Sequence, residues 1–521
     1  MSDGVYRLAK PRKKGLLSLI FSRFFLIVLL LLAQIFLITT FYSWLRGYLP
    51  IFSTISVLFT IGGIIYLFNS DMDSSAKLTW MLLISIVPLF GVGLLAFTQS
   101  NLGHRTIQRR VEELINETRK AIPQSPETMG KLKDDPYATD DLVTYMNRSG
   151  CFPVFENTEV TYYPLGEDKF AAMLEELRKA EKFIFMEYFI IEEGYMWGEI
   201  LKILEEKAKA GVDVRVLYDG MNEIALLPSN YCELLQQHGI QGKVFAPILP
   251  IVSSHYNYRD HRKILVIDGK VAFNGGVNLA DEYINRVEKF GHWKDTAVML
   301  KGDAVRSFTL MFLQMWNITE ENAQFEPWIN ATGYNPENPS GYVIPFGDCP
   351  LDEDKVGRAV YMDILNRATD YVHIMTPYLI LDDELETAII YAAQRGVDVR
   401  IILPGIPDKK PAFALAKSHY SRLHRTGVKI YEYTPGFVHA KVFVSDDCKA
   451  VVGTINLDYR SLYHHFECAT YMYKTDCVAD VERDFQETMA KCREVTAESI
   501  QNESLYYKVM GSLMKFVAPL M

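Results

Sequence analysis

Two stretches of this chain, which begin at His261 and His439, repeat one pattern at the same spacing. In each, a lysine follows the histidine by two positions, and an aspartate follows the lysine by five. A glycine and, three positions later, an asparagine then stand at equal distances from the aspartate in both stretches. Ordinary residue frequencies would produce such a matched pair far less than once in about a million chains. The repeat therefore predicts two halves of similar fold.

The surroundings of the two motifs indicate that both halves are α/β. Residues 210–217 (AGVDVRVL) match residues 395–402 (RGVDVRII), and each follows a helix-like segment. Before that segment stands an apolar, strand-like run, at 183–191 in one half and at 371–381 in the other. Strand, helix and strand in this order form the βαβ unit of a parallel or mixed sheet that is flanked by helices.

The boundaries of the halves follow from the loops around them. A cluster of Pro, Asn and Gly separates the two repeats, which is typical of a seam. We expect half 1 at 151–328 and half 2 at 329–521, related by a pseudo-twofold axis. Residues 101–150 are expected to form a linker that consists of a helix and a loop.

The front of the chain is apolar enough to suggest a membrane anchor at 24–100, behind a basic tail at 1–23. Residues 24–45, 48–68 and 78–97 contain no charged side chain, and each stretch is about as long as a bilayer-crossing helix. Basic residues flank the first and the third stretch, and both flanks favour the cytoplasmic side. Three full crossings would place these flanks on opposite sides of the membrane. Either one basic flank lies on the side that it disfavours, or one of the three stretches enters the bilayer and returns to the same side.

The end of half 2 predicts an amphipathic helix. Apolar residues recur there at helical spacing, namely Leu505, Val509, Leu513, Phe516 and Leu520. Two interpretations stand side by side. The helix lies in the bilayer interface near the mouth of the site, or it packs against half 2.

Composition excludes some partners. The chain has 54 basic and 64 acidic side chains and a net charge of −10, which argues against nucleic acid. Its seven cysteines are scattered without a C-x-x-C pair, so neither a zinc site nor a redox dithiol is indicated. We expect no metal and no cofactor.

The two motifs favour phosphoryl chemistry. Side chains two apart on a strand project together, so His261 lies beside Lys263 and His439 beside Lys441. Asp268 precedes a glycine in a turn dipeptide and is expected to brace that turn. Two half-sites facing one another would surround a phosphodiester with imidazoles, ammonium groups and amides. One imidazole can attack phosphorus to give a covalent phosphohistidine while the other protonates the leaving oxygen.

The duplicated motif resembles that of the phospholipase D superfamily, and its context, H-R-K-I-L-V-I-D-G, N-L-D-Y-R-S-L and H-F-E, is similar to bacterial cardiolipin synthases. The resemblance implies that His261 is the nucleophile and His439 the general acid and base. It also implies phosphate contacts for the lysines and asparagines of both motifs, Lys263, Asn278, Lys441 and Asn456. Asp268 and Asp446 complete the two motif sets. Asp295 and Glu467 would orient the histidines. After the first glycine of each motif stand Gly276, which offers only backbone, and Thr454, which can donate to a substrate.

The resemblance further implies a membrane phosphatidyltransferase that makes cardiolipin and glycerol from two phosphatidylglycerol molecules. We expect it in the bacterial plasma membrane as a multi-pass protein with cytoplasmic catalytic halves, and a homo-oligomer is left open. The alternative keeps the chemistry and hydrolyses phospholipids with water. A non-catalytic scaffold is disfavoured because both motif sets are complete. His464 and His465, beside the second motif, are interpreted either as structural residues or as residues at the rim of the site.

Overall fold

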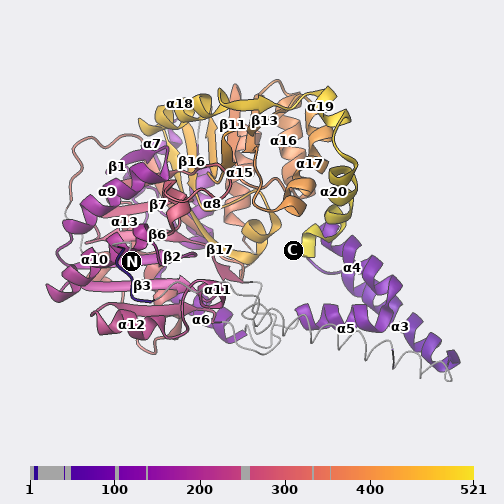
Figure 1. Cartoon of the computed structure of the whole chain (residues 1–521), viewed down its shortest axis with the longest axis horizontal. Helices are drawn as coiled ribbons and strands as arrows, with labels where there is room; N and C mark the ends of the chain where they lie inside the picture. The colour runs from indigo at the N-terminus through magenta and orange to yellow at the C-terminus, as the bar shows by residue number, and fades with distance from the viewer. Residues whose placement is uncertain are drawn as a thin grey trace.

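The computed structural model describes residues 5–9, 40, 49–99, 105–135, 139–247, 258–330, 334–352 and 354–520. Two α/β halves form the main body, with half 1 in magenta and half 2 in orange and yellow (Figure 1). Three apolar helices lie at one end of this body, close to the C terminus (Figure 1).

Half 1 contains a mixed sheet of seven strands in the order β1-β9-β7-β6-β2-β3-β4. The parallel part is β2, β3 and β4, and the remaining pairs are antiparallel. The strands are β1 (Thr158–Tyr163), β2 (Phe183–Tyr188), β3 (Asp213–Asp219), β4 (Gln241–Phe245), β6 (Lys263–Ile267), β7 (Val271–Gly275) and β9 (Ala297–Gly302). The flanking helices are α9 (Gly166–Arg178), α10 (Tyr195–Lys209), α12 (Tyr231–Gln237) and α13 (Val305–Trp316).

Half 2 repeats this order with β10-β17-β16-β15-β11-β12-β13 and adds β18 at the edge. The strands are β10 (Tyr342–Asp348), β11 (Tyr371–Met375), β12 (Asp398–Pro404), β13 (Lys429–Tyr433), β15 (Val442–Ser445), β16 (Lys449–Gly453), β17 (His465–Tyr473) and β18 (Cys492–Glu494). The helices are α15 (Val356–Arg367), α16 (Asp383–Gln394), α17 (Lys410–Arg425) and α18 (Cys477–Met489). The matching strand orders confirm two similar α/β halves with mixed sheets.

The two halves exchange short strands. β5 (Arg259–Asp260) of half 1 pairs with β17 of half 2, and β14 (Gly436–Val438) of half 2 pairs with β8 (His292–Lys294) of half 1. One apolar core also draws buried side chains from both sheets, such as Phe346 and Val298. Because the exchanged strands end next to the two motif histidines, each half fixes the backbone of the other half's motif.

The membrane helices expected from the sequence are not confirmed. Most of 24–45 lies outside the described residues, and 48–68 corresponds to α3 (Leu49–Phe68). The third stretch is broken into α4 (Ser74–Ile86) and α5 (Pro88–Gln99), because proline has no N–H to continue a helix. A search of the described helices finds none with both the length and the apolar character of a bilayer crossing.

The expected linker folds onto the body. It contains α6 (Arg105–Thr118), α7 (Pro126–Lys133) and α8 (Asp140–Gly150), where one helix and a loop were expected. Ser125 caps α7 by accepting a hydrogen bond from Thr128 N, and Pro126 occupies its first turn. A proline at that position starts a helix well, which the loop-like composition concealed.

The C-terminal helix α20 (Leu505–Val517) packs on α17 and leaves most of its apolar stripe outside. Gly511 allows the close approach, since a Cβ there would lie 2.5 Å from the Ala414 carbonyl oxygen. Leu505, Val509, Leu513 and Phe516 remain exposed. The helix therefore combines packing on half 2 with an outward apolar face.

Candidate active site

The two motif histidines lie where the halves exchange strands. His261 follows β5 and His439 follows β14, and both are buried. The His261 N–H donates to Phe466 O at 2.9 Å, and the His439 N–H donates to Lys294 O at 2.7 Å. The backbone of each histidine is thus held by a strand of the opposite half.

Each imidazole is also held by a carboxylate of the opposite half. His261 Nδ1 lies 2.9 Å from both oxygens of Glu467, and His439 Nδ1 lies 2.6 Å from Asp295 Oδ2. A carboxylate on Nδ1 favours the tautomer with its proton there and leaves the lone pair on Nε2. Each motif histidine is thus paired with a carboxylate of the other half, so the site requires both halves.

Burial keeps these histidines neutral. It lowers the pKa of His261 to about 3 and that of His439 to about 4, against the pull of the carboxylates. Burial alone would raise the pKa of Glu467 and Asp295, but the facing histidines hold both pKa values below their ordinary range. At neutral pH the site therefore contains ionised carboxylates and neutral imidazoles, which can act as nucleophile or base.

The motif lysines are almost fully buried beside the histidines. Lys263 Nζ donates to His261 O at 2.5 Å, and Lys441 Nζ donates to His439 O. Burial lowers the pKa of Lys263 to about 8 and that of Lys441 to about 7. The charge of Lys263 also contributes to the lowered pKa of His439, so the half-sites lie within electrostatic range.

A third buried lysine, Lys169 of α9, was missed by the sequence reasoning. Its Nζ donates to Tyr188 Oη at 3.2 Å and to Val277 O at 3.3 Å. Burial lowers its pKa to about 7, and the charges of Asp295 and Lys263 also act on it. It stands in a helix without any motif, so only the fold brings it to the site.

The two asparagines have different surroundings. Asn278 accepts from Ile190 N at 3.0 Å and donates to Tyr283 Oη at 2.8 Å. Asn456 has a buried carbonyl oxygen without a hydrogen-bond partner among the described residues. The phosphate contacts expected for both residues remain predictions and would use the amide N–H groups, one of which in Asn278 already donates to Tyr283.

The glycine–threonine difference between the motifs has a steric reason. A Cβ at Gly276 would lie 2.1 Å from Asp295 Oδ1, so no side chain fits beside that carboxylate. At the matching position Thr454 donates to Glu467, and its Oγ1 also receives the Cys468 N–H at 3.0 Å. Thr454 thus contacts the carboxylate that holds His261, and the substrate contact expected for it remains a prediction.

The rings packed against the two histidines also differ. His465 lies with its ring centroid 5.4 Å from that of His261, and Trp293 lies 5.4 Å from His439. Each of these rings stands two residues before the carboxylate that holds the histidine. His465 is buried, so it belongs to the interior of the site and not to its rim.

The motif aspartates brace turns. Asp268 accepts from three backbone N–H groups at 2.8, 2.7 and 2.9 Å, those of Glu181, Lys182 and Phe183. Asp446 does the same at 2.9, 3.0 and 2.9 Å for Thr369, Asp370 and Tyr371. Both aspartates adopt a positive φ, which Asp and Asn tolerate better than most residues. They therefore fix the strands that carry the lysines.

Replacing these aspartates should affect stability more than chemistry. We expect Asp268→Asn to lower the free energy of unfolding by about 2 kcal/mol, because one buried N–H loses its acceptor. Asp446→Asn should cost about half as much, because its partners reach solvent. Denaturant melts measure both. A loss of turnover per folded molecule without a loss of stability would contradict this role.

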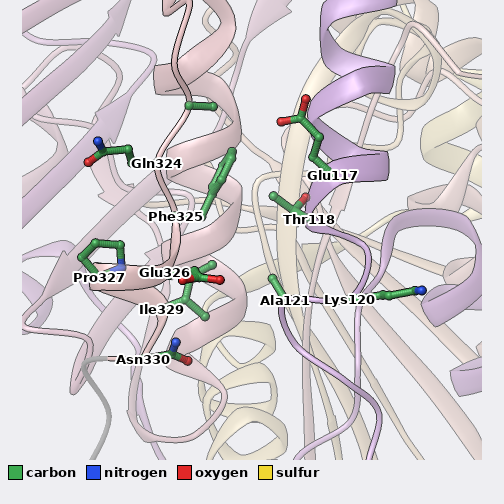
Figure 2. Close-up of a pocket in the computed structure, with 11 residues that line it drawn as sticks. Glu117, Thr118, Lys120, Ala121, Gln324, Phe325, Glu326, Pro327, Ile329 and Asn330 are labelled. Atoms are coloured by element: carbon green, nitrogen blue, oxygen red, sulfur yellow. The ribbon is translucent and has the colours of Figure 1, made fainter.

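The cavity in Figure 2 lies apart from these residues. It measures about 590 Å³ and opens between the end of α6 and the segment from Ala323 to Asn330. Its lining contains none of the predicted site residues. It is therefore a groove between the linker and half 1.

Comparisons with known proteins agree with the duplicated site. The family described as "Cardiolipin synthase, PLD-like domain" matches residues 173–316 and 361–489. A cardiolipin synthase of Halalkalibacterium halodurans is 32% identical, over 95% of this chain and 98% of that protein. An uncharacterized protein of Streptococcus mutans is 57% identical, over 88% of this chain and 100% of its own length.

The fold has a counterpart among solved structures. A phosphatidylserine synthase of Haemophilus influenzae aligns with a TM-score of 0.56 at 16% identity, over 73% of this chain and 97% of that one. At that identity the likeness concerns the fold alone.

The fold and the duplicated site define an enzyme of the phospholipase D type. Within that class, the chain belongs to the bacterial cardiolipin synthase family. Membership makes it a phospholipid phosphatidyltransferase.

Proposed function

We propose that the enzyme makes cardiolipin and glycerol from two molecules of phosphatidylglycerol through a phosphohistidine. The observation that carries this proposal is the crossed pairing of His261 with Glu467 and of His439 with Asp295. It supplies two fixed imidazoles with their Nε2 atoms available. Beside the imidazoles, Lys263 and Lys441 offer two ammonium groups to the equatorial oxygens of one phosphodiester.

The first step forms the covalent intermediate. The Nε2 lone pair of His261 attacks phosphorus of the first phosphatidylglycerol, and the bond to the glycerol oxygen breaks. His439, protonated when the phosphate anion is bound, donates its proton to that oxygen, and glycerol leaves. The imidazolium formed on His261 keeps its proton on Nδ1, which donates a hydrogen bond to Glu467.

The second step reverses these roles. The glycerol hydroxyl of the second phosphatidylglycerol gives its proton to neutral His439, and its oxygen attacks the phosphohistidine. The phosphorus–nitrogen bond breaks, and cardiolipin leaves with His261 restored. One phosphodiester replaces another, so no nucleotide is consumed.

The surroundings of the two histidines support this division of roles. Glu467 accepts from Thr454 as well as from His261, so its charge is shared. Besides His439, Asp295 accepts, among the described residues, a hydrogen bond from the backbone N–H of Thr296 at 2.8 Å and none from another side chain. The less shared carboxylate favours a protonated His439 as acid, while His261 stays neutral to attack.

The products test this function. Purified full-length protein is incubated with phosphatidylglycerol in detergent–lipid micelles, and lipids and glycerol are measured by mass spectrometry. We expect cardiolipin and glycerol in equal amounts. Phosphatidic acid without cardiolipin would replace the proposal with phospholipid hydrolysis.

The buried lysines predict a fall in rate at alkaline pH. Below a pKa of about 7 Lys441 is charged and can hold the phosphate, and it loses that charge as pH rises. We expect kcat/KM to decline from about pH 7 upward, and kcat to decline at higher pH, because bound phosphate favours the charged amine. Rate profiles from pH 5 to about pH 9 measure both. A kcat/KM that rises through this range would contradict the lysine role.

We also propose that an apolar surface of α3, α4 and α20 contacts the bilayer. Large apolar side chains are exposed on all three helices, among them Leu58, Phe68, Leu78, Leu505 and Leu513. α4 and α20 are joined directly, since Thr79 Oγ1 donates to Phe516 O at 2.8 Å. Their exposed side chains can therefore enter one lipid surface, which supports a plasma-membrane location.

Charges on α20 should uncouple the enzyme from lipid. We expect the double variant Leu505→Glu with Leu513→Glu to lose about 2–4 kcal/mol of binding free energy to phosphatidylglycerol vesicles, because two leucine side chains no longer enter the bilayer. Vesicle flotation measures binding, and activity in micelles should stay near normal. Undiminished flotation would show that α20 does not contact lipid. Gln501→Glu with Asn502→Glu, just before the helix, is the charge-matched control.

A further inference from the structure

We propose that His261, His465 and Glu467 form a binding site for zinc, and that bound zinc switches the enzyme off. This inference goes beyond the proposed transfer reaction, in which no step uses a metal. The binding itself is independent of the proposed function, and only the inhibition rests on it.

The three residues converge in one buried place. A ligand atom of each lies within 4.8 Å of those of the other two. Glu467 lies 2.9 Å from His261 Nδ1 and 3.6 Å from His465 Nδ1. Tetrahedral zinc with bonds of about 2.1 Å needs ligand atoms about 3.4 Å apart, so small side-chain shifts would complete three corners.

The ring nitrogens of His465 make no hydrogen bond among the described residues. His465 is only 8% exposed, and both nitrogens are buried. A buried imidazole without a partner is costly, and a ligand on either nitrogen would remove that cost. The matching position in half 1 is Trp293, so half 2 alone has this third group.

The donor set selects the metal class. Two imidazoles and one carboxylate, with a fourth position for water, suit zinc. Magnesium and calcium prefer oxygen ligands and are not expected to bind. Cobalt(II) occupies similar sites and reports tetrahedral geometry through visible absorption, so it serves as the probe.

Zinc at this place would block the first chemical step. Binding through Nδ1 of His261 requires the other tautomer, so the single ring proton moves through solvent from Nδ1 to Nε2, which then has no lone pair. Binding through Nε2 occupies the attacking atom directly. In both cases Glu467 is bound to the metal and no longer orients the nucleophile.

The experiment uses the full chain in detergent after removal of any polyhistidine tag. We expect wild-type protein to bind one cobalt ion with the intense visible bands of a tetrahedral site, and zinc to displace it. His465→Asn should weaken cobalt binding on the order of a hundredfold and raise by the same factor the zinc concentration that halves transfer, with each protein measured against its own metal-free rate. His464→Asn, which alters the neighbouring histidine outside the cluster, should behave as wild type.

Three results would overturn the proposal. They are the absence of tetrahedral cobalt bands in wild type, equal cobalt affinity of wild type and His465→Asn, and equal loss of affinity in His464→Asn. If His465→Asn does not fold, His465→Gln replaces it, and the rise in Tm that zinc gives to wild-type protein is compared with the rise in that variant. Cobalt binding through His465 in a protein that makes no cardiolipin would sustain the site and reject the transfer reaction.

Discussion

His261→Ala is expected to abolish transfer, with a rate loss of about ten-thousandfold or more, because it removes the attacking nitrogen. It should also remove the covalent intermediate. Phosphatidylglycerol labelled with ³²P, mixed with wild-type protein and quenched in base, should leave label on the protein that acid releases, as a phosphohistidine does. The variant should carry no label, and peptide mapping should place the wild-type label on His261.

His373→Ala is the matched control for that experiment. His373 is a buried histidine of half 2 whose Nδ1 lies 2.9 Å from a carboxylate, that of Glu482, and whose ring stacks on Phe485. Replacing His373 by alanine removes about as much buried packing as His261→Ala does, and the contacts that it removes, with Glu482 and Phe485, lie outside the site. We expect reduced stability with normal turnover per folded molecule. Label that persists in His261→Ala would assign the nucleophile elsewhere.

The motif spacing predicted a large part of this architecture. The equal spacing from His261 to Asn278 and from His439 to Asn456 predicted two similar halves, which the strand orders confirm. Such spacing is local, and local sequence determines which residues share a strand and where its turn lies.

Contacts between distant segments were beyond that reasoning. The family resemblance named Glu467 and Asp295, but only the exchanged strands β5 and β14 show that each carboxylate serves the histidine of the other half. Lys169 reaches the site only through packing of α9. Residues 78–97 were expected to form one membrane helix, and the structure has two short helices that meet at Pro88.

The strand exchange has a consequence for the reaction. Because Glu467 holds His261 and Asp295 holds His439, loosening the interface between the halves disturbs both histidines at once. The two proposed steps therefore depend on one interface, and substituting a histidine itself is the direct way to separate them. His439 offers that test.

His439→Ala should separate the two chemical steps. Glycerol is a poor leaving group, so without the acid the variant should form intermediate from phosphatidylglycerol very slowly. A phosphatidyl ester of p-nitrophenol leaves without protonation, so the variant should release nitrophenol in a burst of one equivalent per site and then stop, because no base activates the acceptor. Turnover beyond the burst should fall by about a thousandfold or more.

The same substrate distinguishes the two histidines in one assay. His261→Ala should give no burst, since no nitrogen attacks phosphorus, whereas His439→Ala should give a full burst and accumulate labelled protein. If the results were exchanged, His439 would be the nucleophile. The second hydrogen bond that Glu467 accepts, from Thr454, would then not determine the roles. If both variants gave a burst, either histidine could attack, and the near-symmetry of the half-sites would extend to their chemistry. A burst in His439→Ala alone would assign attack to His261 and acid–base chemistry to His439, two imidazoles whose neighbours differ, with Thr454 and His465 on one side and Trp293 on the other.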